Sequence, residues 1–248
     1  MNNHDLTVIV TGAARDIGRE ICRALARDGW FVCVGDLNRA GAEETAALLR
    51  AEGAGASAHA CDVSDETSVQ AMVREILAAR GAIDLLVNNA GICQMKPILD
   101  ITVAEWDRTM AINLRGTFLC SREVFRHMRE RRRGGIISIA SAAGKLGGLA
   151  AGAHYSASKA GVMCFTKSLA LQAAPYHINV NAVCPGPTST EMTDAWGKDV
   201  NDDFAAKIPW KEYARSTDIA EAVAFLASPK ARYITGEILD VNGGLVMD

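Results

Sequence analysis

The sequence predicts an α/β fold in which an open, doubly wound parallel sheet of about seven strands carries helices on both faces. Short apolar, β-branched runs alternate with stretches of helical hydrophobic period along the chain. Runs that are apolar throughout indicate strands buried on both faces, and helical connections impose parallel pairing with right-handed crossovers. The first run precedes TGAARDIGRE, residues 11–20, which has the order strand, glycine turn and helix.

Each expected element has its own local signal. The expected strands are the apolar runs 7–10, 30–36, 57–63, 83–89, 135–141, 178–184 and 237–244. The expected helices lie between them, at 17–28, 39–52, 65–80, 102–133 with an interruption near Asn113, 155–174 and 216–228. Residues 186–210 lack a strand pattern and carry apolar side chains that need a cover, so we expect a small mobile flap over a pocket. No linker-like stretch divides the chain, and residues 1–248 are expected to form a single domain.

Composition and charge exclude several classes of protein. The net charge is -3, and the main basic run, residues 129–133, is interpreted as a solvated helix end, so nucleic acid is not an expected partner. The chain has no apolar run of transmembrane length and no secretory leader, which predicts a cytoplasmic protein without a membrane partner. The 7 cysteines include no C-x-x-C pair and the 5 histidines have no ligand spacing, so no metal site is expected.

Signals for nucleotide binding gather where the expected strands end. Gly12 allows a tight turn and Gly18 allows close helix packing or approach of a diphosphate, although an ordinary strand-to-helix turn has the same pattern. Asp62, after the third strand, can accept a bond from an adenine amino group or place a charge before the next helix. The NNAG segment, residues 88–91, can tie neighbouring strands together or let a ribose approach closely.

Asp36, at the end of the second strand, bears on the choice of dinucleotide. An acid at this place can accept bonds from both ribose hydroxyls and repel a 2′-phosphate, so we expect NAD to be favoured over NADP. The alternative is that Asp36 caps the following helix. Arg15 and Arg39 can each reach a 2′-phosphate, and they favour NADP instead.

A second group of residues suggests proton transfer. Tyr155 and Lys159 lie one turn apart on an expected helix, where an ammonium group would lower the pKa of the phenol and make it an acid or base for an alcohol or ketone. Ser141, at a strand end, can bond the substrate oxygen, whereas Ser138 lies nearer the middle of that strand. Asn113, at the helix interruption, can hold a water molecule or satisfy the backbone of a kink.

In combination, these motifs are specific. TGAARDIG, Asp36, Asp62, NNAG, Asn113, Ser141, YSASK and PGPTST occur in the order that resembles the short-chain dehydrogenase/reductase family, from Leu6 to the C-terminus. The resemblance implies a Rossmann-type sheet that binds a nicotinamide dinucleotide, and an enzyme that interconverts a secondary alcohol and a ketone. It implies a catalytic tetrad of Asn113, Ser141, Tyr155 and Lys159, in which Lys159 also bonds the nicotinamide ribose. It further implies that the segment with Pro185, Gly186, Thr188 and Thr190 covers the nicotinamide.

Asp16 departs from the family pattern, which has glycine at this position. Aspartate tolerates the left-handed conformation that glycine adopts, and its carboxylate can cap the first N–H groups of the helix. We therefore expect the turn to survive. Because the acid competes with phosphate for the positive helix end, dinucleotide binding is expected to be weaker than in an Asp16→Gly variant.

The expected contacts cover a cofactor and a substrate. The cofactor-binding residues are expected to be Gly12, Arg15, Asp16, Ile17, Gly18, Asp36, Leu37, Cys61, Asp62, Val63, Asn89, Ala90, Gly91, Tyr155, Lys159, Pro185, Gly186, Thr188 and Thr190. The substrate residues are expected to be Gln94, Ser141, Ala143, His154, Tyr155, Met192, Trp196 and Trp210. This mixture of amide, imidazole and indole groups suits a polar hydroxy or keto compound such as a sugar, polyol or hydroxy acid.

Two alternatives remain open. The chain is also similar to 3-oxoacyl-acyl-carrier-protein reductases, which have a basic docking residue where this chain has Leu171 and Gln172, although residues 129–133 offer another basic patch. A nucleotide-sensing protein on the same fold would need no proton donor. The apolar content of helices 102–133 and 155–174, together with the resemblance, predicts a homotetramer with paired helices.

Overall fold

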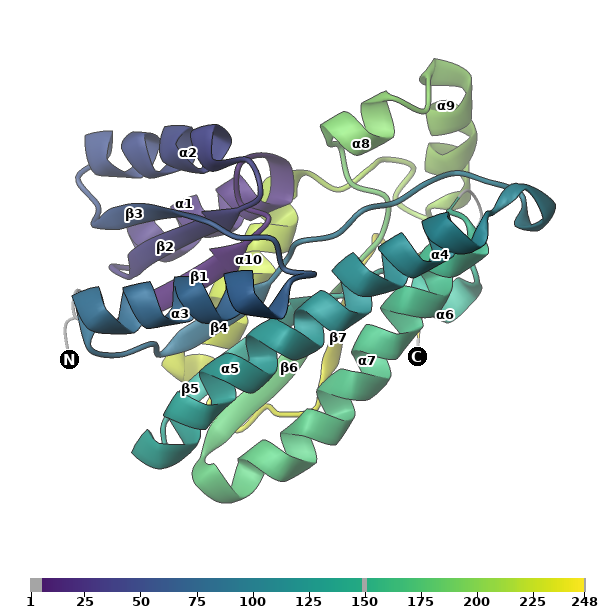
Figure 1. The fold of residues 1–248 in the computed structure, drawn as a ribbon. Coiled ribbons are helices and arrows are strands. Elements are labelled where there is room, and N and C mark those ends of the chain that lie inside the picture. The colour runs from purple at the N-terminus through teal and green to yellow at the C-terminus, as the bar shows by residue number, and fades with distance from the viewer. Residues whose placement is uncertain (1–5, 149–150, 248) are drawn as a thin grey trace.

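The computed structural model describes residues 6–148 and 151–247 and contains a sheet of 7 strands between two layers of helices (Figure 1). The strands are β1 Thr7–Thr11, β2 Phe31–Asp36, β3 Ala56–Ala60, β4 Leu85–Asn88, β5 Gly134–Ile139, β6 Ile178–Pro185 and β7 Ile238–Val241. The helices are α1 Asp16–Arg27, α2 Arg39–Ala51, α3 Glu66–Arg80, α4 Val103–Met110, α5 Gly116–Arg131, α6 Ala143–Leu146, α7 Ala153–Ala173, α8 Glu191–Asp194, α9 Lys198–Lys207 and α10 Ser216–Ala227. The expected fold class is confirmed.

The sheet has the strand order β3-β2-β1-β4-β5-β6-β7, and every neighbouring pair is parallel. The order reverses direction between β1 and β4, so the crossovers after β1 and after β4 lie on opposite faces. The carboxyl ends of all the strands lie along one edge. A crevice at that edge is the usual ligand site of such a sheet.

Two apolar cores hold the layers together, one on each face of the sheet. One core joins the strands to α1, α2 and α10, with Ile21, Leu49 and Val223 completely buried. The other core joins the strands to α3, α5 and α7, with Ile76 and Val124 among its buried residues. Burying such a side chain contributes about 1.5–3 kcal/mol, so the strand ends stand on a well-anchored scaffold.

The boundaries of some elements differ from the expected ones. β5 ends at Ile139, so Ser141 lies in the loop after the strand rather than at its last position. The expected interruption near Asn113 is a π-helical turn, Ala111–Arg115, between α4 and α5. The flap segment contains two short helices, α8 and α9, which a search for strand patterns could not reveal. Among residues 6–148 and 151–247, none of the helices combines the length and the apolar character that a membrane crossing needs.

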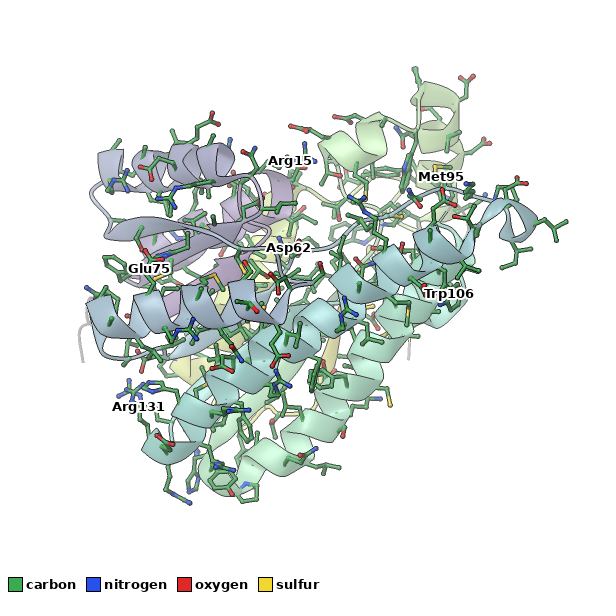
Figure 2. All side chains as sticks on the ribbon, in the orientation of Figure 1. Arg15, Asp62, Glu75, Met95, Trp106 and Arg131 are labelled. Atoms are coloured by element: carbon green, nitrogen blue, oxygen red, sulfur yellow. The ribbon has the colours of Figure 1, made fainter. Side chains whose placement is uncertain are left out.

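The basic run at the end of α5 lies far from the strand carboxyl ends. Arg131 donates to the carboxylate of Asp84 at 3.0 Å, and Asp84 immediately precedes β4. Figure 2 places Arg131 at the opposite end of the molecule from Arg15 and Met95. Residues 129–133 therefore cannot serve as a docking patch beside the ligand edge.

Candidate active site

The turn between β1 and α1 is tightly folded. Gly12 has φ +64°, in the left-handed region that glycine adopts without steric cost. A Cβ atom on Gly18 would lie 2.3 Å from the carbonyl oxygen of Gly12, so a larger residue does not fit there. Asn89 Nδ2 donates to the carbonyl oxygens of Thr11 and Gly12 at 3.0 and 2.8 Å. This amide therefore ties the turn to the end of β4.

Asp16 takes the conformation that was expected of it but makes a different contact. It is the first residue of α1, with φ +48° in the left-handed region. The expected capping bond is absent, because Arg15 occupies the N-cap position and no side chain caps α1. The Asp16 carboxylate instead accepts a hydrogen bond from the N–H of Glu191 at 3.3 Å. The carboxylate therefore faces the flap rather than its own helix.

A cavity of about 920 Å³ runs along the strand carboxyl ends, and this volume suits a dinucleotide with a small substrate. All the expected cofactor-binding residues line it: Gly12, Arg15, Asp16, Ile17, Gly18, Asp36, Leu37, Cys61, Asp62, Val63, Asn89, Ala90, Gly91, Tyr155, Lys159, Pro185, Gly186, Thr188 and Thr190. They come from the ends of five strands, β1, β2, β3, β4 and β6, and from helix α7, which explains why they are scattered along the chain.

The two acids near the ends of β2 and β3 each hold a turn together. Asp36 accepts from the N–H of Ala14 at 3.0 Å and from the N–H of Asn38 at 2.8 Å. Asn38, rather than Asp36, is the N-cap of α2. Asp62 accepts from both the N–H and the hydroxyl of Ser64, at 2.9 and 2.6 Å. Each carboxylate thus has protein partners of its own.

Tyr155, Lys159 and Ser141 meet at the middle of the cavity. Lys159 Nζ donates to the carbonyl oxygen of Ile139, the last residue of β5, at 2.7 Å, and it lies 5.8 Å from the centre of the Tyr155 ring. Ser141 Oγ accepts from the N–H of Ala143 at 3.2 Å and is also hydrogen-bonded to the Tyr155 phenol. The arrangement puts a hydroxyl, a phenol and an amine around one point, as proton transfer to an oxygen requires.

Asn113 is completely buried in the π-helical turn and is held from both ends of its amide. Its Oδ1 accepts from the N–H of Ile92 at 2.9 Å, and its Nδ2 donates to the Ile92 carbonyl at 2.9 Å and to Ser158 Oγ at 3.0 Å. The amide in this π turn thus holds the loop after β4 at Ile92. A Cβ on Gly91 would lie 3.3 Å from Asn113 Oδ1 and 3.4 Å from Lys159 Nζ, so these three residues converge.

The acid–base properties of the pair differ from the expected ones. Burial raises the pKa of the Tyr155 phenol above its ordinary range, and the hydrogen bond with Ser141 opposes this only in part. Burial also lowers the pKa of Lys159 to about 8. The pKa of Tyr155 is thus raised overall and not lowered as expected, because desolvation outweighs the groups that favour the phenolate. A phenol of raised pKa keeps its proton at neutral pH and is suited to donating it.

Ser138 and Asn88, the first residue of the NNAG segment, have structural positions. Asn88 Nδ2 donates to Ser121 Oγ at 2.9 Å and to Ser138 Oγ at 3.3 Å, all within the buried sheet. Ser138 is therefore separated from the cavity, and Ser141 is the serine that lines it.

The expected substrate residues divide into two groups. Ser141, Ala143, Tyr155, Met192 and Trp196 line the cavity. Gln94, His154 and Trp210 are not among the lining residues.

The second group lies outside the cavity for identifiable reasons. His154 is completely buried, and its Nε2 lies 3.3 Å from Gln94 Oε1, so the two side chains are occupied with each other. Trp210 is 76 % exposed, and its N–H donates to the carbonyl of Gly243. His154 adjoins Tyr155 on α7 but projects in a different direction, because successive helical residues point in different directions.

Several lining residues have no sequence motif that marks them. They are Cys93, Arg108, Leu146, Phe204 and Leu245, which come from five separate segments. Only the expectation that the flap covers a pocket could have pointed to Phe204. Within the described ranges, no cluster of three or more His, Cys, Asp or Glu side chains could hold a metal ion.

Comparison with known proteins gives one consistent picture. A family profile described as enoyl-(acyl carrier protein) reductase matches residues 12–246. The 3-oxoacyl-(acyl-carrier-protein) reductase FabG of Staphylococcus aureus (strain Mu50) is 40% identical over 245 residues, covering 97% of this chain and 98% of that protein. The reductase of the same name from Escherichia coli (strain K12) is 40% identical over 247 residues, covering 100% of both chains.

A solved structure has the same overall shape. The crystal structure of a protein named gox2181 superimposes with a TM-score of 0.95, at 35% identity, covering 99% of both chains. At this similarity the likeness extends over the whole sheet and both helical layers.

The relatives also correct the expected choice of cofactor. FabG reductases are NADPH-dependent, so the expectation that NAD is favoured over NADP is wrong. That expectation depended on a free Asp36 carboxylate, whereas both oxygens of Asp36 accept backbone N–H groups. Asp36 therefore has a structural role in its own turn, and its presence does not show which dinucleotide is bound.

Proposed function

The chain belongs to the short-chain dehydrogenase/reductase family of NAD(P)-dependent oxidoreductases, and from this membership we propose that it reduces the keto group of 3-oxoacyl thioesters. The product is the corresponding 3-hydroxyacyl thioester. The relatives support this substrate better than the sugar, polyol or hydroxy acid that the sequence suggested.

One observation in the structure carries the proposal: the substrate part of the cavity is mostly apolar. Leu146 of α6, Met192 and Trp196 of the flap, Phe204 of α9 and Leu245 near the C-terminus line it. The Trp196 and Phe204 rings pack 6.0 Å apart. Such a wall gains free energy from an acyl chain, about 0.8 kcal/mol for each buried methylene group. A polyol would leave several hydroxyl groups without hydrogen-bond partners there, which is costly.

The cavity also fits a nicotinamide dinucleotide. The tight glycine turn stands at the N-terminus of α1, where a helix favours phosphate. Gly91, beside Lys159 and Asn113, presents no side chain toward the space where a ribose would lie. When bound, the reduced dinucleotide supplies the hydride for the keto carbon. The residues that would hold it are Lys159, the backbone at Thr188 and residues 12–18 at the junction of β1 and α1, which we call the phosphate turn.

In the proposed reaction the protein supplies position and a proton. Ser141 Oγ bonds the keto oxygen and aligns it with the Tyr155 hydroxyl. Tyr155, whose raised pKa keeps it protonated, donates its proton to that oxygen as it becomes a hydroxyl group. Lys159 stabilises the phenolate that remains, and Asn113 holds the loop after β4 against the lysine. The reverse reaction uses the same groups in the opposite order.

We also propose that the enzyme is a cytoplasmic homotetramer. A shallow groove between α5 and α7 is lined by Met110, Leu114, Phe118, Cys164 and Phe165. Phe118 and Phe165 form an edge-to-face pair there, and Phe118 is 39 % exposed. A second copy that brings the same helices would cover this apolar surface. Buried thiols, such as those of Cys22 and Cys120, suit a reducing compartment.

A panel of substrates tests the proposed reaction. Oxidation of NADPH, and in parallel of NADH, is followed with acetoacetyl-CoA and longer 3-oxoacyl thioesters. Reduction of the oxidised dinucleotides is followed with sugars, polyols and hydroxy acids. We expect the thioesters to have the highest kcat/KM. Turnover of polyols or sugars without turnover of thioesters would show that the proposal is wrong.

A further inference from the structure

Asp16 and Arg15 connect the phosphate turn to the substrate flap. The N–H of Glu191, the first residue of α8, donates to Asp16 Oδ1 at 3.3 Å. The Arg15 guanidinium forms an ion pair with the Glu191 carboxylate. Arg15 Nε also lies 3.8 Å from Asp16 Oδ2. Two adjacent residues of the turn thus hold both the backbone and the side chain of one flap residue.

The flap is itself a connected unit, so its attachment at Glu191 affects all of it. Thr190 caps α8 through a capping box with Thr193. Asn201 of α9 donates to the Thr193 carbonyl at 2.9 Å, and the Tyr213 hydroxyl donates to Asn201 Oδ1 at 3.0 Å. These bonds couple α8 to α9. Met192 and Trp196, which line the substrate part of the cavity, lie within this unit.

We propose that Asp16 is a positioning residue that, with Arg15, fastens the flap to the phosphate turn and so fixes the substrate wall. The identity of the residue supports this inference. Glycine would adopt the left-handed backbone more easily, and a carboxylate repels phosphate groups at this end of the helix. The contact with Glu191 is a gain that offsets both disadvantages, and it exists only with an acceptor at residue 16. The dinucleotide end therefore sets the geometry of the substrate end.

Limited proteolysis of the full-length protein tests the attachment directly. Lys198 and Lys207 at the two ends of α9 are exposed sites for trypsin. Four variants are compared with the wild type. Asp16→Gly keeps the turn but removes the acceptor, and Asp16→Asn keeps an acceptor oxygen without charge. Glu191→Gln removes the ion pair but keeps the N–H.

The matched control is Glu221→Gln, which breaks an equally exposed ion pair between Arg27 of α1 and α10. Kinetics with NADPH and acetoacetyl-CoA are measured on the same samples. Cleavage at the two lysines and the KM for the thioester are expected to rise about three- to tenfold in Asp16→Gly, the effect of losing a hydrogen bond and weakening an exposed ion pair. The KM for the thioester is measured at saturating NADPH, so that a change in dinucleotide affinity at residue 16 does not contribute to it.

The conservative variants sharpen the result. Asp16→Asn and Glu191→Gln are expected to lie between the wild type and Asp16→Gly, and the control is expected to match the wild type. Cleavage and KM at wild-type values in Asp16→Gly would overturn the proposal. Proteolysis does not depend on the substrate, so faster cleavage without any thioester turnover would support the attachment while contradicting the proposed reaction.

Discussion

The catalytic group and the flap are built in contrasting ways. Lys159 and Asn113 are buried and hydrogen-bonded to the backbone of Ile139 and Ile92, which belong to β5 and to the loop after β4. The contacts of the flap with the turn after β1 are exposed, such as the ion pair of Arg15 with Glu191. Groups held from the core can maintain the geometry that proton transfer needs. Groups held at the surface can adapt to a ligand, so under the proposed function chemistry and substrate selection are placed in regions of different rigidity.

Under the proposed function, the buried group carries out the reaction and the flap recognises the substrate. Loops on a rigid scaffold vary and move more than the scaffold does. In this molecule the flap meets the turn between β1 and α1 at Asp16. The two regions are therefore distinct in rigidity but are not independent.

Removing the proton donor should have the largest effect. Tyr155→Phe deletes the phenolic hydroxyl that bonds Ser141 and leaves the ring in place. We expect kcat to fall about 10²- to 10⁴-fold, the usual contribution of a general acid, with the Kd for the dinucleotide nearly unchanged. Stopped-flow turnover and a fluorescence titration measure the two quantities. Unchanged turnover would contradict the assignment and favour a nucleotide sensor.

A change in the rigid phosphate turn should act on binding rather than on chemistry. Gly18→Ala places a methyl group 2.3 Å from the Gly12 carbonyl oxygen and 2.7 Å from Asn89 Nδ2. We expect the dinucleotide Kd to rise about tenfold or more, because overpacking of this size costs about 1–3 kcal/mol. Calorimetric titration checks the Kd.

Gly135→Ala is the matched control for this change. Its added Cβ meets only the Leu85 side chain closely, at 3.3 Å. If both variants weaken binding equally, the tight turn is not the cause.

The pH dependence of the reduction tests the buried pair. The pKa of Lys159 is lowered to about 8, so raising the pH through this value removes the cation that stabilises the Tyr155 phenolate. We expect kcat/KM for reduction to fall above about pH 8, by up to about tenfold per pH unit, as for a single ionisation. This fall is measured by a profile of kcat/KM between about pH 6 and about pH 10. A profile that stays flat to about pH 10 would show that the lysine charge is not used.

The lowered pKa of Lys159 also affects the stability of the folded protein. The folded protein holds fewer protons on Lys159 than the unfolded chain between about pH 8 and the ordinary lysine value of 10.5. The contribution of Lys159 to the free energy of unfolding should therefore increase as the pH rises through that window, which stabilises the folded protein. The raised pKa of Tyr155 acts in the opposite direction above its ordinary value of 10.0.

The smallest expected effect concerns dinucleotide affinity at residue 16. Asp16→Gly removes a carboxylate from the positive end of α1, where the phosphates bind, and we expect the Kd to fall about two- to fivefold, the effect of a partly exposed charge near a helix end. Titration at low and moderate salt checks this, since screening should reduce the difference. An equal or higher Kd in the variant would mean that the contact with Glu191 outweighs the repulsion.

The sequence predicts the features that depend on periodicity and on strand order. The apolar runs give the sheet, and the spacing of Tyr155 and Lys159 places both on one helix face. The interruption at Asn113 follows from its position in an otherwise long helix. The scattered residues expected to bind the cofactor line one cavity because most of them follow parallel strands that end at one edge, which the fold class already implies.

Other features depend on tertiary contacts that no local pattern contains. The partner of Asp16 is 175 positions away, so only the folded chain brings its carboxylate to Glu191. His154 adjoins Tyr155 in the sequence but is buried outside the cavity, where its Nε2 meets Gln94 Oε1. The pKa of Tyr155 depends on burial that its distance from Lys159 does not indicate. Asp36 illustrates the limit of single-residue inference, because the same carboxylate can serve a ribose or its own turn.

The most direct test of the account is a chain-length series. In the proposed function, the buried group of Tyr155 and Lys159 carries out the reaction. An apolar wall that includes Trp196 and Phe204 selects an acyl chain. With NADPH and 3-oxoacyl thioesters of increasing length, we predict that kcat/KM rises about fourfold per added methylene until the wall is covered, while kcat stays nearly constant. Trp196→Ala should flatten this rise. A kcat/KM that does not depend on chain length, or that is exceeded by a polyol, would contradict the account.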